Sequence, residues 1–118
     1  MTDPSSSRKR IPSSTALDLT GLVDYGEAAV VSRTLVENAA GTITLFSFDA
    51  GQSISEHTAP FDAFVQVVDG TGEFVIGGKQ VEVRPGQVVL MPANVPHAVK
   101  AAQRFKMILV MLRKPAEK

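Results

Sequence analysis

The sequence predicts one all-β domain, a barrel or sandwich of antiparallel strands, and three observations carry this prediction. Short runs rich in β-branched and aromatic residues recur from about residue 28 to the end of the 118-residue chain. Turn-forming residues interrupt these runs about every 8 to 12 residues. No apolar stripe of helical period continues for more than about two turns. Together these features indicate about eight to ten strands.

The expected strands can be placed along the chain. The stretch GTITLFSFDAG (41–51) leaves both of its alternating faces largely apolar, as in a strand inside a closed or sandwiched sheet. The other strand-like stretches are AVVSRTLVE (29–37), AFVQVVDGTGEFVIGGKQVEV (63–83), QVVLM (87–91), HAVKA (97–101) and FKMILVMLR (105–113). We expect TGLVDYGEAA (20–29) to be a loop with room for a short helical turn.

Two residue pairs mark the tightest turns of the long stretch. Asp69-Gly70 and Gly77-Gly78 tolerate positive φ, the conformation that two-residue hairpins need. Each pair is therefore expected to close a hairpin between its flanking strands.

The amino-terminal region differs from the rest of the chain. Residues 1–16 are rich in serine, contain the basic triplet Arg8 to Arg10 and show no hydrophobic periodicity. We expect a mobile tail over 1–16 and a single domain over 17–118. An alternative left open is that this arm lies against a partner subunit.

Composition excludes several functions. Twelve basic residues balance twelve acidic ones, so no net field attracts nucleic acid or an anionic membrane. Cysteine is absent, which removes disulfides, thiolate nucleophiles and sulfur-ligated metals. The apolar runs are far shorter than the roughly 20 residues of a membrane helix, and no secretory signal is recognisable at the start. The expectation is a cytoplasmic protein without nucleic-acid or membrane partners.

The chain has two histidines, His57 and His97. Strands far apart in sequence can be neighbours in an antiparallel barrel, and residues of matching parity then point inward together. A buried polar group without a partner costs about 1 to 3 kcal/mol. The imidazoles are thus expected to converge on a metal, a hydrogen-bonded ligand or water, or solvent at the barrel mouth.

Glycines and a proline around these histidines resemble the two motifs of the cupin superfamily. The matching residues are Gly51, His57 and Gly70 for the first motif, and Gly86, Pro92 and His97 for the second. The resemblance spans about residues 41–112. It implies a small RmlC-like jelly roll, the double-stranded β-helix of two antiparallel sheets, in which three histidines and a glutamate bind one divalent metal.

The resemblance implies only part of that ligand set. His57 and His97 fall on the first and last histidine positions, whereas Ala59 takes the place of the second histidine and Ala63 that of the glutamate. Such a site would hold zinc, nickel, copper or iron weakly, because imidazole is a borderline-soft ligand. The alternative is a relic pocket without metal. Asn94 replaces the glycine of Pro-x-Gly and also tolerates a left-handed conformation.

Asp62 is a candidate third ligand. On a regular strand it faces away from the pocket, but a bulge forced by Pro60 would turn it inward and complete a two-histidine, one-carboxylate triad. The two alanines suggest a roomy, apolar pocket that takes a small organic molecule. The residues expected to line it are Ala59, Phe61, Ala63, Met91, Phe105 and Met107.

Three functions stay open. The first is a metal-dependent enzyme acting on a small metabolite, as the resemblance implies; the second is a non-catalytic binding module, and the third a structural protein. No catalytic residue can be assigned, and no phosphate-binding or dinucleotide-binding glycine motif is present. The apolar-faced stretches 29–37 and 105–113 are expected to leave an edge that a second copy covers, which predicts a homodimer.

Overall fold

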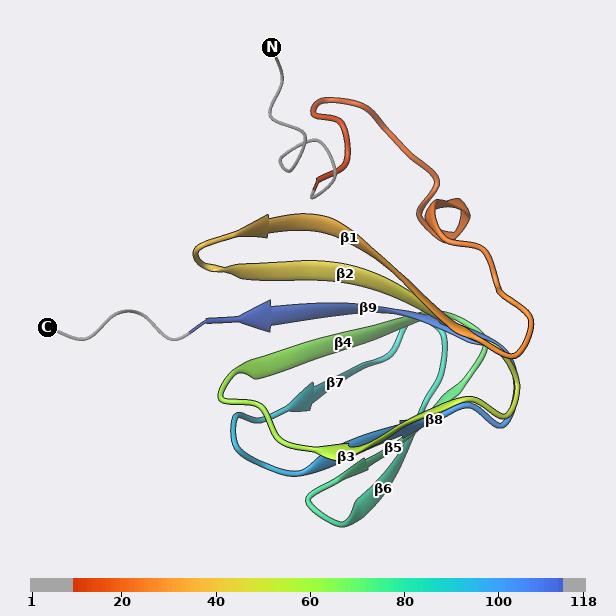
Figure 1. The fold of residues 1–118 in the computed structure, drawn as a ribbon, viewed down its shortest axis with the longest axis vertical. Helices are drawn as coiled ribbons and strands as arrows, with labels where there is room; N and C mark the ends of the chain where they lie inside the picture. Colours follow the sequence, from red (N-terminus) through yellow and green to blue (C-terminus); the bar gives the residue numbers. More distant parts are fainter. Residues whose placement is uncertain (1–9, 114–118) are drawn as a thin grey trace, which may run out of the picture.

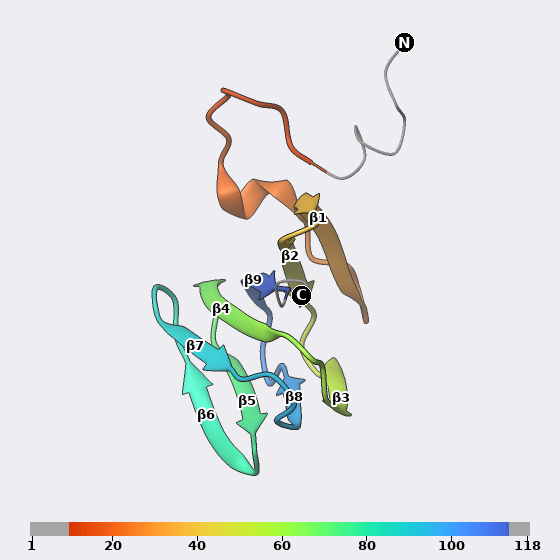
Figure 2. The same cartoon turned by 90° about the vertical axis from the view of Figure 1, so that its left-hand side faces the viewer.

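The computed structural model describes residues 10–113. Within them, nine strands form two antiparallel sheets that pack face to face (Figures 1 and 2). One short 3₁₀ helix precedes the strands. The elements are η1 (Leu19–Leu22), β1 (Val30–Asn38), β2 (Gly41–Phe48), β3 (Ser53–His57), β4 (Asp62–Asp69), β5 (Gly72–Ile76), β6 (Lys79–Val83), β7 (Val88–Met91), β8 (His97–Lys100) and β9 (Phe105–Leu112). The predicted all-β jelly roll is confirmed.

Neighbouring strands in this fold are often distant in sequence. The five-stranded sheet has the order β1-β2-β9-β4-β7, and the four-stranded sheet has the order β3-β8-β5-β6. The chain therefore passes repeatedly from one sheet to the other. One consequence corrects a prediction: β9 lies in the middle of its sheet and forms no edge.

The two predicted hairpins have different outcomes. Gly77-Gly78 closes the β5–β6 hairpin, with Ile76 paired to Lys79. The prediction of a hairpin at Asp69-Gly70 is wrong, because β4 and β5 belong to different sheets. Gly70 instead forms a corner at φ +67°, where an added Cβ would lie 2.1 Å from the carbonyl oxygen of Arg104. The corner needs glycine for conformation and for space.

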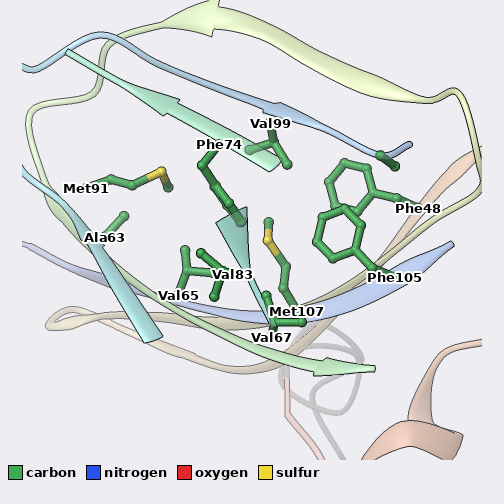
Figure 3. Packing of buried hydrophobic residues seen from close by; sticks show 11 residues of the cluster. Phe48, Ala63, Val65, Val67, Phe74, Val83, Met91, Val99, Phe105 and Met107 are labelled. Carbon is green, nitrogen blue, oxygen red and sulfur yellow. The ribbon is translucent and has the colours of Figure 1, made fainter. Parts of the chain in front are cut away.

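The core lies between the sheets (Figure 3). Along β4 the burial alternates, so that Ala63, Val65 and Val67 face inward, as the period of a half-buried strand requires. The rings of Phe48 and Phe105 stack at 4.6 Å between centroids at one end of this core. Aromatic packing of this kind adds to the burial of apolar area.

A second apolar cluster lies on the outer face of the five-stranded sheet. There the amino-terminal segment packs its buried Val23, and with it Leu22 and Leu19 of η1, against Leu35 and Leu45. The short helix η1 overlaps the start of the segment 20–29, in which the sequence leaves room for a helical turn. The expected tail over 1–16 lies outside the described residues up to residue 9; its described part begins at Arg10, which pairs with Val36 of β1.

Polar contacts also attach the amino-terminal segment to the five-stranded sheet. The Tyr25 hydroxyl donates to Oδ2 of Asp69 at 2.6 Å. Nζ of Lys106 lies 4.8 Å from the Tyr25 ring centroid and donates to the Thr20 carbonyl oxygen. This lysine is buried, so the carbonyl and the ring face are what compensate its lost hydration. No helix in residues 10–113 is long and apolar enough to cross a membrane.

Candidate functional site

The two histidines lie side by side at one end of the four-stranded sheet. His57 ends β3, His97 begins β8, and the two are direct partners in the antiparallel register. Their ring centroids are 4.4 Å apart and the rings meet edge to face at 69°. His97 is buried and His57 is exposed, so the pair extends from the interior to the surface of the molecule.

A β-bulge decides which side chain faces His97. Ile54 pairs with Val99, but the next pair is His57 with His97, so β3 has one residue more than β8 between these points. In regular pairing Glu56 would stand opposite His97. The extra residue inverts the parity and places the imidazole there instead. This bulge differs from the one considered at Pro60, and no glycine or proline in β3 signals it in the sequence.

Backbone carbonyls fix the orientation of both rings. Nδ1 of His57 lies 2.9 Å from the Ser55 carbonyl oxygen, and Nδ1 of His97 lies 3.1 Å from the Val95 carbonyl oxygen. A carbonyl oxygen only accepts, so each Nδ1 carries the proton and, in the neutral ring, Nε2 keeps its lone pair. This is the tautomer in which histidine binds metals through Nε2.

Nε2 of His97 is not sealed into the core. Every buried side-chain nitrogen or oxygen of residues 10–113 has a hydrogen-bond partner. This nitrogen has no protein partner among the same residues, so it must reach space outside the packed interior. His57 is exposed, and its ring lies 4.4 Å from that of His97.

The loop before His97 holds it in place. Asn94 adopts φ +65°, which confirms the left-handed conformation that its sequence position suggested. Its N–H donates to the Ala59 carbonyl oxygen at 2.8 Å and so joins the two loops that follow β7 and β3. The Val95 N–H donates to the Pro92 carbonyl oxygen, and the Val95 carbonyl accepts from His97.

The carboxylate of Asp62 does not join the two histidines. It lies on the outward side of β4, and its Oδ1 accepts the Ala93 N–H at 2.9 Å. The strand is regular at this end, with Ala63 inward against Met91. Within the described residues no group of three histidine, cysteine, aspartate or glutamate side chains could hold a metal ion. Among the described residues, the two imidazoles are therefore the groups at this place with the chemistry of metal ligands.

The predicted pocket-lining residues separate into two sets. Ala63, Met91, Phe105 and Met107 are part of the packed core, all at most 4% exposed. Ala59 and Phe61 are half-buried in the loop between β3 and β4. A hollow of about 460 Å³ contains none of these residues; it is lined by Glu73, Phe74, Val75, Gln80, Val81, Glu82 and Lys100 of the four-stranded sheet.

The separation of the two imidazole rings is compatible with an open metal site, but two protein ligands are fewer than such sites use. Metal–nitrogen bonds of about 2.0–2.1 Å at about a right angle would place two imidazole centroids about 4.5 Å apart. The observed separation of 4.4 Å is compatible with that arrangement. Closed structural sites use four protein ligands and catalytic ones three. Two histidines would leave most coordination positions to water or a ligand.

Comparison with known proteins supports the fold. A family model described as a cupin domain matches residues 44–112. A conserved protein of unknown function from Streptococcus pyogenes is 39% identical, with 91% of this chain and 94% of that one covered and a TM-score of 0.85. A cupin superfamily protein from Desulfitobacterium hafniense is 29% identical over 90% and 97% of the chains, with a TM-score of 0.83.

A further match reaches part of a larger protein. A cupin 2 conserved barrel domain protein from Leptotrichia buccalis is 39% identical over 82% of this chain and 47% of that one, with a TM-score of 0.79. No curated protein matches. Since the family model spans more than half of the chain and carries both histidines, this protein belongs to the cupin family as a small RmlC-like jelly roll.

Proposed function

We propose that this cupin binds a divalent transition metal weakly through Nε2 of His57 and Nε2 of His97. The remaining coordination positions would be filled by oxygen atoms of a small polar metabolite. Zinc, nickel, copper and iron suit imidazole ligands better than magnesium or calcium do. A bound metal of this kind polarises a carbonyl or carboxylate oxygen. The ligand is held beside His57, which is exposed.

One observation carries the proposal. Both Nδ1 atoms are bound to backbone carbonyl oxygens, so both neutral rings keep the lone pair on Nε2, and the two rings lie only 4.4 Å apart. Nothing in the protein accepts or donates at Nε2 of His97 among residues 10–113. Two facing imidazoles with the same tautomer fixed by the backbone are prepared for a shared electrophile.

A second candidate is a non-catalytic cupin that binds a small molecule without metal. It is favoured by the lack of a third ligand among the described residues. In this case the two Nε2 atoms accept hydrogen bonds from a hydroxyl or amide group of the ligand.

Calorimetric titration of tag-free, chelator-stripped protein with Ni²⁺ and Zn²⁺ tests the proposal. The chain has two histidines and no cysteine, so no other imidazole or thiolate can contribute to binding. We expect one weak site per chain, with affinity reduced at least about tenfold in His57→Ala and in His97→Ala. Asp62→Asn is the matched control and should bind as the native protein does, because its carboxylate is bonded to Ala93.

Two results would contradict metal binding. One is an absence of heat with either ion; the other is native affinity in His57→Ala, which is at an exposed position and should leave the fold intact. Thermal stabilisation by one compound from a panel of sugars, keto acids and aromatic acids, unchanged by chelator, would then favour the second candidate.

A further inference from the structure

The inner face of the five-stranded sheet carries two methionines on either side of one alanine. Met91 of β7 and Met111 of β9 are both direct register partners of Ala63, which lies between them on β4. These three residues, Met111, Ala63 and Met91, are called the methionine row below. Ala63 adds only a methyl group between the two longer side chains. The row therefore brings two thioethers to one level of the sheet.

The methionine row faces the interior of the sandwich. Ala63 is buried, and Met111 has the same parity along β9 as the buried Met107. Met91 is 1% exposed, and Figure 3 shows its side chain beside Ala63 in the space between the sheets. Met111 is half-buried. Both thioethers thus lie on the side of their sheet that faces the layer in which His97 is buried.

The methionine row and the two histidines lie at the same end of the sandwich. β3 ends at His57 and leads into β4, whereas β7 ends at Met91 and leads into β8, which begins at His97. The loops that follow β3 and β7 are joined by a backbone hydrogen bond at this end. Facing sheets are about 10 Å apart, a gap that side chains from both sheets fill together. Methionine is unbranched and has three rotatable side-chain bonds, so its sulfur can adapt to an ion held between the sheets.

The donors at this end of the sandwich are soft. Sulfur ligands, methionine among them, favour Cu(I), whereas carboxylates and carbonyls favour magnesium, calcium and manganese. The carboxylate of Asp62, next to Ala63 in the chain, is on the outer side of β4 and accepts the Ala93 N–H. Imidazole nitrogen also suits copper. Two imidazoles and a thioether therefore form a donor set that discriminates in favour of the reduced ion.

We propose that the methionine row supplies a thioether as the third protein ligand of the metal held by His57 and His97, and that this donor selects Cu(I). The inference rests on the proposed function, in which the two Nε2 atoms bind the metal. It narrows the choice among zinc, nickel, copper and iron to copper in its reduced state. Three protein ligands are also the number that open zinc sites use.

Competition with the chromogenic Cu(I) chelator bicinchoninate, in ascorbate and without oxygen, measures the Cu(I) affinity of the full chain. The chain has no cysteine, so no thiolate competes with the thioethers. Affinity should fall at least about tenfold in Met91→Leu/Met111→Leu, the lower end of what the loss of an outer partner of a metal site costs. Leucine is close to methionine in volume, so the core should stay packed.

Met107→Leu is the matched control for this double variant. It removes a buried methionine from the same face of β9, one helical-pitch-independent step of four residues before Met111, and should bind Cu(I) as the native protein does. Native Cu(I) affinity in Met91→Leu/Met111→Leu, or an equal loss in Met107→Leu, overturns the inference.

Two further measurements separate this inference from the proposed function. The double variant should keep its affinity for Ni²⁺, which the imidazoles bind, and an equal loss of Ni²⁺ affinity would refute the selection of Cu(I). X-ray absorption of the Cu(I)-loaded native protein should show a sulfur neighbour that the double variant lacks. A shell of nitrogen and oxygen alone refutes the thioether ligand while leaving the histidine site intact. Cu(I) and Ni²⁺ affinities that His57→Ala leaves unchanged contradict the proposed function itself.

Discussion

The hydroxyl of Tyr25 lies 2.6 Å from Oδ2 of Asp69, and this bond joins the amino-terminal segment to the end of β4. Burial raises the pKa of Tyr25 above its ordinary value, and the hydrogen bond and negative charge of Asp69 raise it further. The neutral phenol is thus the form that the folded chain stabilises.

Alkaline pH should loosen this attachment. A raised folded-state pKa contributes stability that is complete below the unfolded value of about 10 and disappears as the pH rises above it. Tyr25 is the sole tyrosine and tryptophan is absent, so phenolate absorbance reports this one group. We expect its titration well above pH 10, and a weaker alkaline loss of stability in Tyr25→Phe. Titration at the ordinary pKa would contradict this account.

Acid pH should weaken a second contact. Nε of Arg104 donates to Asp49 at 2.8 Å, and this bond, followed by the Ala28 N–H, lowers the pKa of the Asp49 carboxyl. A lowered folded-state pKa contributes stability present above the unfolded value, about 3.9, and lost as the pH falls through the folded one. Denaturation of Asp49→Asn should therefore show lower stability at neutral pH and a flatter acid dependence. Parallel acid profiles would refute the assignment.

Alanine at the corner glycine should be costly. In Gly70→Ala the new Cβ meets the Arg104 carbonyl oxygen and the backbone must keep a positive φ. Strain of this kind costs of the order of 1–3 kcal/mol before any steric clash is added. Gly78→Ala is the control, because it also has positive φ but nothing within 4 Å of the new Cβ. Urea denaturation should rank Gly70→Ala as clearly the less stable; equal stabilities would show that the close approach is relieved.

Truncation of the stacked phenylalanine should destabilise the core. Phe105 is fully buried, and its ring stacks on Phe48. Phe105→Ala should lower the free energy of unfolding by about 3–5 kcal/mol, as for other buried phenylalanines. Phe61→Ala, at a half-buried loop position, should cost much less in the same urea titration. A small effect of Phe105→Ala would mean that the core collapses around the vacated space.

Features that depend on local sterics can be predicted from the amino-acid sequence alone. Gly77-Gly78 closes a hairpin because glycine permits positive φ, and Asn94 takes the left-handed turn for a related reason. The alternation of Ala63, Val65 and Val67 likewise specified the inward face of β4, since side chains alternate along any strand. Turn residues and apolar alternation together were sufficient for the fold class.

The pairing of the strands, in contrast, depends on how the whole chain packs. Asp69-Gly70 has hairpin residues, yet it forms a corner, because β4 finds its partners in β7 and β9 rather than in β5. The candidate site depends on the same kind of choice: the bulge in β3 sets His57 rather than Glu56 opposite His97. Conformational preferences act on one residue and its neighbours, whereas register and sheet membership follow from the burial of whole faces, which sequence-distant strands achieve jointly.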